Sequence, residues 1–344
     1  MKERNFPIEN MRAVACVFVV FGHVWWISGF PLDGVSGVLF KLVCDGTYYF
    51  CFIGGFLFGR YVCVDFGYKD YLRSRFFSTI LPYLFFCSIV VSAAVFAKGP
   101  YSEYFFGKFD GFFGRYVYPY VGYVLTGRAI TGYWFIPMMT LFFLVSPAVV
   151  RWGCMPLRFR CVSILAWVFL AGFAGRSLDN INPLQGLFYY MPTFMLGVLF
   201  CCEKERLSRW SGWGLPLFLI FFFVSCVDLF CFGSAYETQK PMFEYAGFNY
   251  NYFLKMAQVV GLYFCFERWL NFSVRGVSVV SAVSFTIYLS HPVVIAVVHR
   301  LDFVNGSGAL YWLLMSLSVV GVCVGFSLLG KRVLKGKSRF VLGC

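Results

Sequence analysis

Long apolar runs recur along the whole of this 344-residue chain, and they limit the folds that it can adopt. Hydrophobic residues make up 60% of the sequence, whereas charged residues make up only 13%. A helix needs about 20 apolar residues to cross a bilayer, and no soluble domain needs this much apolar surface. We therefore predict an all-α fold, a polytopic bundle of about ten transmembrane spans. The spans are expected near residues 13–30, 38–59, 76–97, 132–150, 161–175, 187–202, 212–233, 252–270, 279–298 and 310–330.

The basic residues predict how this bundle is oriented. Placing the N-terminus in the cytoplasm leaves 20 Lys and Arg residues on the cytoplasmic side and seven in the outer loops. Because cytoplasmic loops carry an excess of basic residues, both termini are expected in the cytoplasm. The net charge of +13 is explained by this topology and by contact with anionic membrane lipid. Nothing in the sequence suggests a nucleic acid partner.

Residues 1–344 are expected to form a single integral-membrane domain, with no soluble appendage, linker or internal repeat. The first apolar run carries His23 and two adjacent tryptophans, unlike a cleavable signal peptide. The 14 Cys residues are scattered without a C-x-x-C spacing, which indicates packing rather than disulfide bonds. With only three His residues in the chain, no metal site is expected.

Arg12 and His23 are the most informative pair of polar residues. They lie eleven residues apart in the first apolar run. That spacing is close to three helical turns, so both side chains point the same way, about 16 Å apart along the axis. Arg12 is expected at one membrane face and His23 near the middle of the bilayer. An ionisable side chain at that depth is costly and usually faces a wet cavity or the bundle interior. The pair therefore indicates chemistry on a charged substrate.

Two further ionisable residues are candidates for the same interior. Asp45 is expected at the same depth as His23, where a carboxylate would hold the imidazole tautomer. The alternative is an ion pair with Lys41, four residues earlier on the same helix face. His291 precedes Pro292, where the helix should kink. It either lines a cavity and binds donor or acceptor, or satisfies backbone groups freed by the proline.

Several other residues are candidates for binding an acceptor. Tyr133 and Trp134 begin the fourth expected span, where stacking on an acceptor competes with interfacial anchoring. Asp228 lies inside the seventh expected span. The outer segments 98–131 and 234–251 mix aromatic and polar residues, which is typical either of a carbohydrate surface or of an interfacial aromatic belt.

Five segments of the chain resemble the acyltransferase-3 family, whose integral-membrane proteins O-acylate sugars of lipopolysaccharide, common antigen, peptidoglycan and other acceptors. The segments, spread over nearly the whole chain, are IENMRAVACVFVVFGH (8–23), FCFIGGFLFGR (50–60), YLRSRFFSTILPY (71–83), GYWFIPMMTLFFLVSP (132–147) and SFTIYLSHP (284–292). The first keeps the family's basic-x10-His motif as Arg12 and His23. Three positions depart from the family pattern: Gly54 replaces the usual Ser, Ser78 replaces the second Arg of an Arg-x-x-Arg motif, and Glu9 replaces the commoner Asp.

The resemblance implies an O-acyltransferase of the bacterial inner membrane. Its donor would be a cytoplasmic acyl-CoA, most simply acetyl-CoA, and its acceptor a hydroxyl group of a surface-glycan sugar such as O-antigen, possibly lipid-linked. His23 is the expected general base or transient acyl carrier, because a neutral imidazole can take the proton of a sugar hydroxyl. Arg12, Arg73 and Arg75 are expected where CoA phosphates arrive, because guanidinium groups suit phosphate. The alternative is a transporter or flippase of a lipid-linked saccharide, although the inverted repeats common in transporters are not evident.

Overall fold

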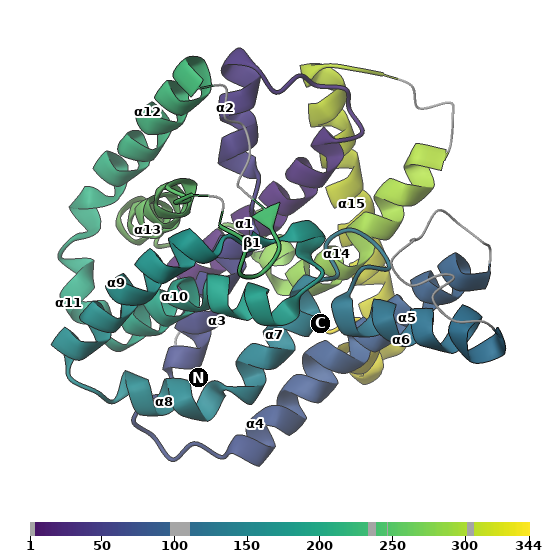
Figure 1. The fold of residues 1–344 in the computed structure, drawn as a ribbon, viewed down its shortest axis with the longest axis horizontal. Coiled ribbons are helices and arrows are strands. Elements are labelled where there is room, and N and C mark those ends of the chain that lie inside the picture. The colour runs from purple at the N-terminus through teal and green to yellow at the C-terminus, as the bar shows by residue number, and fades with distance from the viewer. Residues whose placement is uncertain (1–3, 97–110, 233–238, 246, 301–305) are drawn as a thin grey trace.

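The computed structural model describes residues 4–96, 111–232, 239–245, 247–300 and 306–344, and these are almost entirely helical. The longer helices are α1 (Phe6–Trp25), α5 (Leu81–Phe96), α9 (Leu157–Ala174), α10 (Pro183–Cys202), α12 (Gly214–Phe232), α13 (Asn251–Trp269), α14 (Arg275–Arg300) and α15 (Ala309–Leu334). The shorter helices are α2 (Gly34–Val43), α3 (Thr47–Gly59), α4 (Tyr68–Arg75), α6 (Tyr118–Thr126), α7 (Phe135–Leu144), α8 (Ser146–Gly153), α11 (Lys204–Ser208) and α16 (Ser338–Val341). Figure 1 shows their arrangement.

Single turns of other helix types and one small sheet complete the structure. The π-helical turns cover Phe76–Ile80 and Phe113–Val117, and the 3-10 turns cover Leu178–Asn180, Ser211–Trp213 and Lys335–Lys337. Strands β1 (Arg176–Ser177) and β2 (Gln239–Lys240) pair in parallel. The polytopic helical fold is therefore confirmed. That the chain is a single domain stays a prediction.

Eight helical stretches of the described chain are long and apolar enough to cross a membrane, and a bent pair makes up to nine. The bent pair is α7 and α8, which meet at 59°. Pro147, in the first turn of α8, has no N–H group to continue α7. The remaining expected span, 252–270, is the 19-residue helix α13. It carries Lys255, Glu267 and Arg268, so its composition is too polar to count with the others.

Helix α1 begins earlier than its apolar residues suggested. The side chain of Asn5 accepts a hydrogen bond from the backbone N–H of Ile8, and Pro7 and Glu9 occupy the first turn. These are the residue types that favour a helix N-terminus. The helix therefore runs from Phe6 and places Arg12 in its second turn and His23 in its last.

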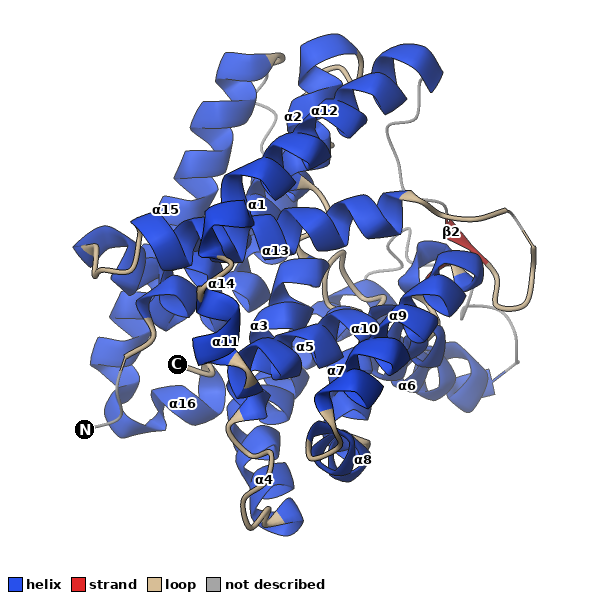
Figure 2. Ribbon diagram, turned by 90° about the vertical axis from the view of Figure 1, so that its left-hand side faces the viewer, coloured by secondary structure: helices blue, strands red, loops and turns tan. Residues whose placement is uncertain are grey.

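Helices α3 and α10 pack closely in the middle of the bundle, and α1 packs on α14 beside them (Figure 1). A Cβ atom added to Gly55 would lie 1.9 Å from the backbone oxygen of Phe194, and one added to Gly197 would lie 2.0 Å from that of Phe52. The missing side chains let the two backbones touch. The chain termini lie on the same side of the molecule as α16 (Figure 2).

The second expected span is broken at the depth of the core. Helix α2 ends at Val43, α3 begins at Thr47, and Asp45 between them has a left-handed φ of 59°. Two side chains of α13 satisfy the carbonyl groups that the break frees. Lys255 donates to the backbone oxygens of Lys41 and Cys44, and Gln258 donates to that of Leu42. The break is therefore a built feature, as expected where irregular backbone is buried in protein.

Candidate active site

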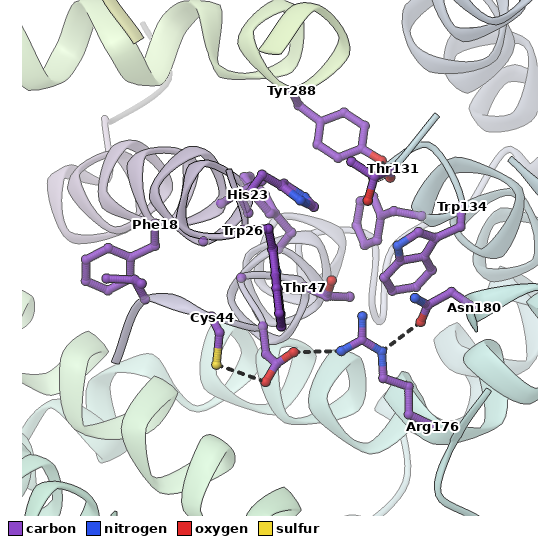
Figure 3. A pocket seen from close by; sticks show the side chains of 18 of the residues that line it. Phe18, His23, Trp26, Cys44, Thr47, Thr131, Trp134, Arg176, Asn180 and Tyr288 are labelled. Atoms are coloured by element: carbon purple, nitrogen blue, oxygen red, sulfur yellow. Dashed lines mark hydrogen bonds and ion pairs between the residues drawn. The ribbon is translucent and has the colours of Figure 1, made fainter. Parts of the chain in front are cut away.

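A cavity of about 470 Å³ opens beside the break between α2 and α3. Its wall combines the end of α1, the break itself, the segment before α7, the loop that carries β1, and α14 (Figure 3). The polar and aromatic residues that shape it include His23, Trp26, Asp45, Trp134, Arg176 and Asn180. We call it the histidine cavity.

His23 reaches this cavity from the last turn of α1 (Figure 3). Its ring centroid lies 5.2 Å from that of His291 on α14. The backbone of Gly132 packs against the imidazole, with a φ of 91° that favours glycine. A Cβ atom there would lie 3.5 Å from Nε2 of His23. The imidazole is therefore held between a second imidazole and a backbone that carries no side chain.

Asp45 lines the same cavity as His23, but its partner is not the histidine. Its Oδ1 atom accepts a hydrogen bond of 2.6 Å from Nη1 of Arg176, and its Oδ2 atom accepts one from the thiol of Cys44. The predicted contact between Asp45 and His23 is therefore wrong, although the two residues do share a cavity. The alternative pair with Lys41 is also wrong, because the helix ends between the two residues and turns Asp45 away.

Arg176 is the main site residue that our sequence interpretation missed. Strand pairing with Gln239 fixes its backbone, its Nε atom donates to Asn180 at 2.7 Å, and its guanidinium lies 5.2 Å above the ring of Trp134. A signal was present in the sequence. Arg176 is one of only seven basic residues expected in the outer loops, where basic residues are disfavoured.

Two predicted acceptor-binding residues lie elsewhere and have structural contacts. Asp228 is buried between Lys41 and the hydroxyl of Tyr250, with which it forms an ion pair and a hydrogen bond. Tyr133 is fully buried, and its hydroxyl donates to the backbone oxygen of Leu289 at 2.7 Å. Neither residue lines the histidine cavity, whereas Trp134 does. Their positions argue against direct contact with an acceptor.

His291 is fully buried next to His23. Its Nδ1 atom lies 3.0 Å from the backbone oxygen of Ile287, one turn earlier in α14, and α14 continues through Pro292. Its Nε2 atom has no hydrogen-bond partner among the described residues. His291 therefore contacts the helix backbone near Pro292 and also lies beside His23, the candidate base.

A second cavity, of about 300 Å³, lies along α3 between Phe50 and Phe58, toward the C-terminal end of that helix. Arg12, Arg75, Ser78 and Gly343 are among its lining residues, and we call it the arginine cavity. The Nε atom of Arg12 donates to Ser281 at 2.9 Å. The Nε atom of Arg75 is buried without a hydrogen-bond partner in the part of the chain described. The cavity therefore presents two guanidinium groups close to the chain termini.

Tyr61, close to this cavity, lies next to two arginines. Burial by itself would raise the pKa of Tyr61, which follows α3, yet the charges of Arg60 and Arg75 hold it below its ordinary value. Arg73 does not line this cavity: it is exposed and lines an adjoining groove, which Arg75 and Phe143 also line. Of the three arginines predicted to meet CoA, the structure brings Arg12 and Arg75 together and leaves Arg73 outside.

Three residues line both cavities: Phe50, Phe135 and Tyr288. The two cavities are therefore neighbours that share one wall. Within the described ranges, no cluster of three or more His, Cys, Asp or Glu side chains forms that could hold a metal ion.

Comparison with protein families identifies the chain. The model of the acyltransferase-3 family, described as an acyltransferase domain, matches residues 6–328. The chain belongs to the acyltransferase-3 family. Comparison with curated proteins and with solved structures found no match.

Membership of the acyltransferase-3 family makes this chain a membrane acyltransferase. The family motifs also acquire places in the fold. Segment 8–23 gives Arg12 to the arginine cavity and His23 to the histidine cavity. Segments 132–147 and 284–292 give Phe135 and Tyr288 to the wall between them.

Proposed function

We propose that this protein is an O-acyltransferase of the bacterial inner membrane. It would move an acyl group, most simply acetyl, from cytoplasmic acyl-CoA to a hydroxyl group of a surface-glycan sugar such as O-antigen or common antigen. One observation carries the proposal: an arginine-lined cavity and a histidine-lined cavity meet at a single wall. Donor and acceptor can then approach from opposite faces of the membrane.

The arginine cavity suits the donor. CoA carries phosphate groups, and guanidinium groups bind phosphate by paired, charge-assisted hydrogen bonds. Arg12 and Arg75 both line this cavity, and the unpartnered Nε atom of Arg75 is a donor without an acceptor among the described residues. Because the termini lie on this side, the excess of basic residues favours the cytoplasm for this face.

The histidine cavity suits a sugar acceptor. Sugars bind to proteins through hydrogen bonds to their hydroxyl groups and through stacking on aromatic rings. The ion pair of Asp45 and Arg176 offers both donors and acceptors, and Trp26 and Trp134 offer rings in the same wall. We assign Asp45 to acceptor binding, in place of the catalytic contact that the sequence suggested.

Chemistry then follows from His23. Its imidazole takes the proton of the acceptor hydroxyl while the hydroxyl oxygen attacks the thioester carbonyl carbon. A C–O bond forms, the C–S bond of the thioester breaks, and the proton passes to the departing CoA sulfur. His291 would act as a positioning residue, because its ring lies beside that of His23 and its Nδ1 atom is held by the backbone of α14.

The test uses membranes that contain the wild type, His23→Ala or His299→Ala at matched levels, supplied with radiolabelled acetyl-CoA and native envelope glycan. His299 is exposed at the end of α14, so it is a matched histidine control. We expect label in glycan with the wild type and with His299→Ala, and its loss with His23→Ala.

The other outcomes are equally informative. Equal label with His23→Ala would remove His23 as the base. No label with the wild type would contradict acetyl transfer to this glycan, and other acyl-CoA donors and acceptors would then be compared in the same membranes.

A further inference from the structure

Three aromatic rings separate the histidine cavity from the arginine cavity. Phe50 comes from α3, Phe135 from the start of α7, and Tyr288 from α14. Their ring centroids lie 6.2 Å (Phe50–Phe135), 6.4 Å (Phe50–Tyr288) and 5.7 Å (Phe135–Tyr288) apart. These are contact distances for aromatic pairs. The rings therefore close on one another, and we call the three the aromatic partition.

Tyr288 is the fixed member of the aromatic partition. Its hydroxyl donates a hydrogen bond to the backbone oxygen of Gly132, which lines the histidine cavity. Its ring stacks on Phe285, which lines the arginine cavity, with centroids 6.2 Å apart and planes at 18°. Tyr288 is thus tied to both sides of the wall, and its ring cannot turn without breaking these contacts.

Phe50 and Phe135 lack the polar tie that fixes Tyr288. Both are only partly buried, and a phenylalanine ring has no hydrogen-bonding group that could hold it in place. A change of rotamer in either ring would give up its contact with Tyr288 but leave the hydrogen bond of Tyr288 to Gly132 in place. On the side of the arginine cavity, the lining residues include Ile53, Ile136 and Met139, which suit an acyl group rather than a phosphate.

We propose that the aromatic partition is the passage for the acyl group, that it admits only short acyl chains, and that it keeps water away from the thioester. This inference rests on the proposed function, since it concerns the acyl group in transit. The carbonyl carbon leaves the CoA sulfur and joins the acceptor oxygen at the partition. Each methylene added to the acyl chain needs space that the three rings occupy, and a close-packed interior gives up such space only at a cost in free energy. Water at the same place would cleave the C–S bond and release free CoA and the carboxylic acid.

The experiment compares acetyl-CoA with hexanoyl-CoA as donors for the wild type, Phe50→Ala, Phe135→Ala and the control Phe188→Ala. Phe188 is a half-buried residue of α10 that packs against Trp167 and lines neither cavity, so its removal does not open the partition. Two quantities are measured, the ratio of hexanoyl to acetyl transfer and the hydrolysis of acetyl-CoA without acceptor. For each variant, CoA affinity and the elution profile in detergent show whether the protein is folded. If an alanine variant does not fold, Phe50→Leu or Phe135→Leu takes its place.

We expect the wild type to favour acetyl, and the two partition variants to raise the transfer ratio by about tenfold or more, the effect of one or more methylenes in a fitted pocket. Their hydrolysis of acetyl-CoA should also rise, whereas Phe188→Ala should change neither quantity. Equal use of both donors by the wild type would overturn the inference. So would an unchanged ratio in both folded partition variants, or loss of all transfer in them with CoA affinity intact. Absence of any transfer by the wild type would instead contradict the proposed function.

Discussion

Arg176 and Asp45 form an ion pair with a nitrogen-to-oxygen distance of 2.6 Å, although 131 residues separate them in the chain. The side chain of each residue is only 13% exposed. Arg176 comes from a loop fixed by β1, and Asp45 from the break between α2 and α3. The pair therefore joins the outer loops to the broken helix at the wall of the histidine cavity.

Replacing one residue of this pair should lower the free energy of unfolding by more than replacing both residues does. Arg176→Gln or Asp45→Asn leaves a charge without its partner, a loss of about 3–5 kcal/mol for buried pairs. The double variant Arg176→Gln/Asp45→Asn should be more stable than the sum of the single losses predicts. Thermal unfolding in detergent measures all four proteins, and strictly additive losses would show that the two side chains do not interact.

Lys255 should stabilise the helix break. Lys255→Met would leave the backbone oxygen of Cys44 without its donor and that of Lys41 with only the thiol of Cys44, and an unsatisfied buried group costs about 1–3 kcal/mol. Lys69→Met, at an exposed position of α4, is the matched control. Unfolding temperature is the measurement, and equal temperatures for the two variants would contradict the role of Lys255.

The arginines of the arginine cavity should differ from Arg73 in their contribution to donor binding. Arg12→Gln and Arg75→Gln should each weaken CoA binding by about tenfold or more, because a hydrogen bond between charged groups contributes about 1.5–3 kcal/mol. Arg73→Gln should weaken it much less, because Arg73 is exposed and does not line the arginine cavity. Isothermal titration with CoA checks the order, and the largest loss in Arg73→Gln would reverse our assignment.

Two neighbouring glycines of α3 should respond differently to a methyl group. In Gly55→Ala, the new Cβ would lie 1.9 Å from the backbone oxygen of Phe194, so α3 and α10 must separate. In Gly54→Ala, the nearest atom is a ring carbon of Phe194 at 3.6 Å, an ordinary contact. We expect a loss of about 1–3 kcal/mol or more for Gly55→Ala and little change for Gly54→Ala. Unfolding temperature and yield in detergent distinguish them.

The sequence interpretation succeeded where the information is local. Nine of the expected spans correspond to helical stretches of the right composition when α7 and α8 count as one, and Arg12 and His23 do face neighbouring cavities. The sequence interpretation was wrong about which residue forms an ion pair or hydrogen bond with Asp45. The predicted partner of Asp45 was His23, and the alternative was Lys41, because residues four apart share a helix face. That rule does not hold across the break at Asp45, so Asp45 and Lys41 each pair with a distant segment.

Apolar length, helical spacing and the distribution of basic residues are properties of single segments, and they determined the membrane bundle and the pairing of Arg12 with His23 on one helix. The Asp45–Arg176 pair and the aromatic partition arise only in the tertiary structure. Phe50, Phe135 and Tyr288 belong to three helices far apart in the chain, and nothing in the order of residues says that their rings meet. Packing between segments decides such contacts, because it depends on the shapes of all the helices at once.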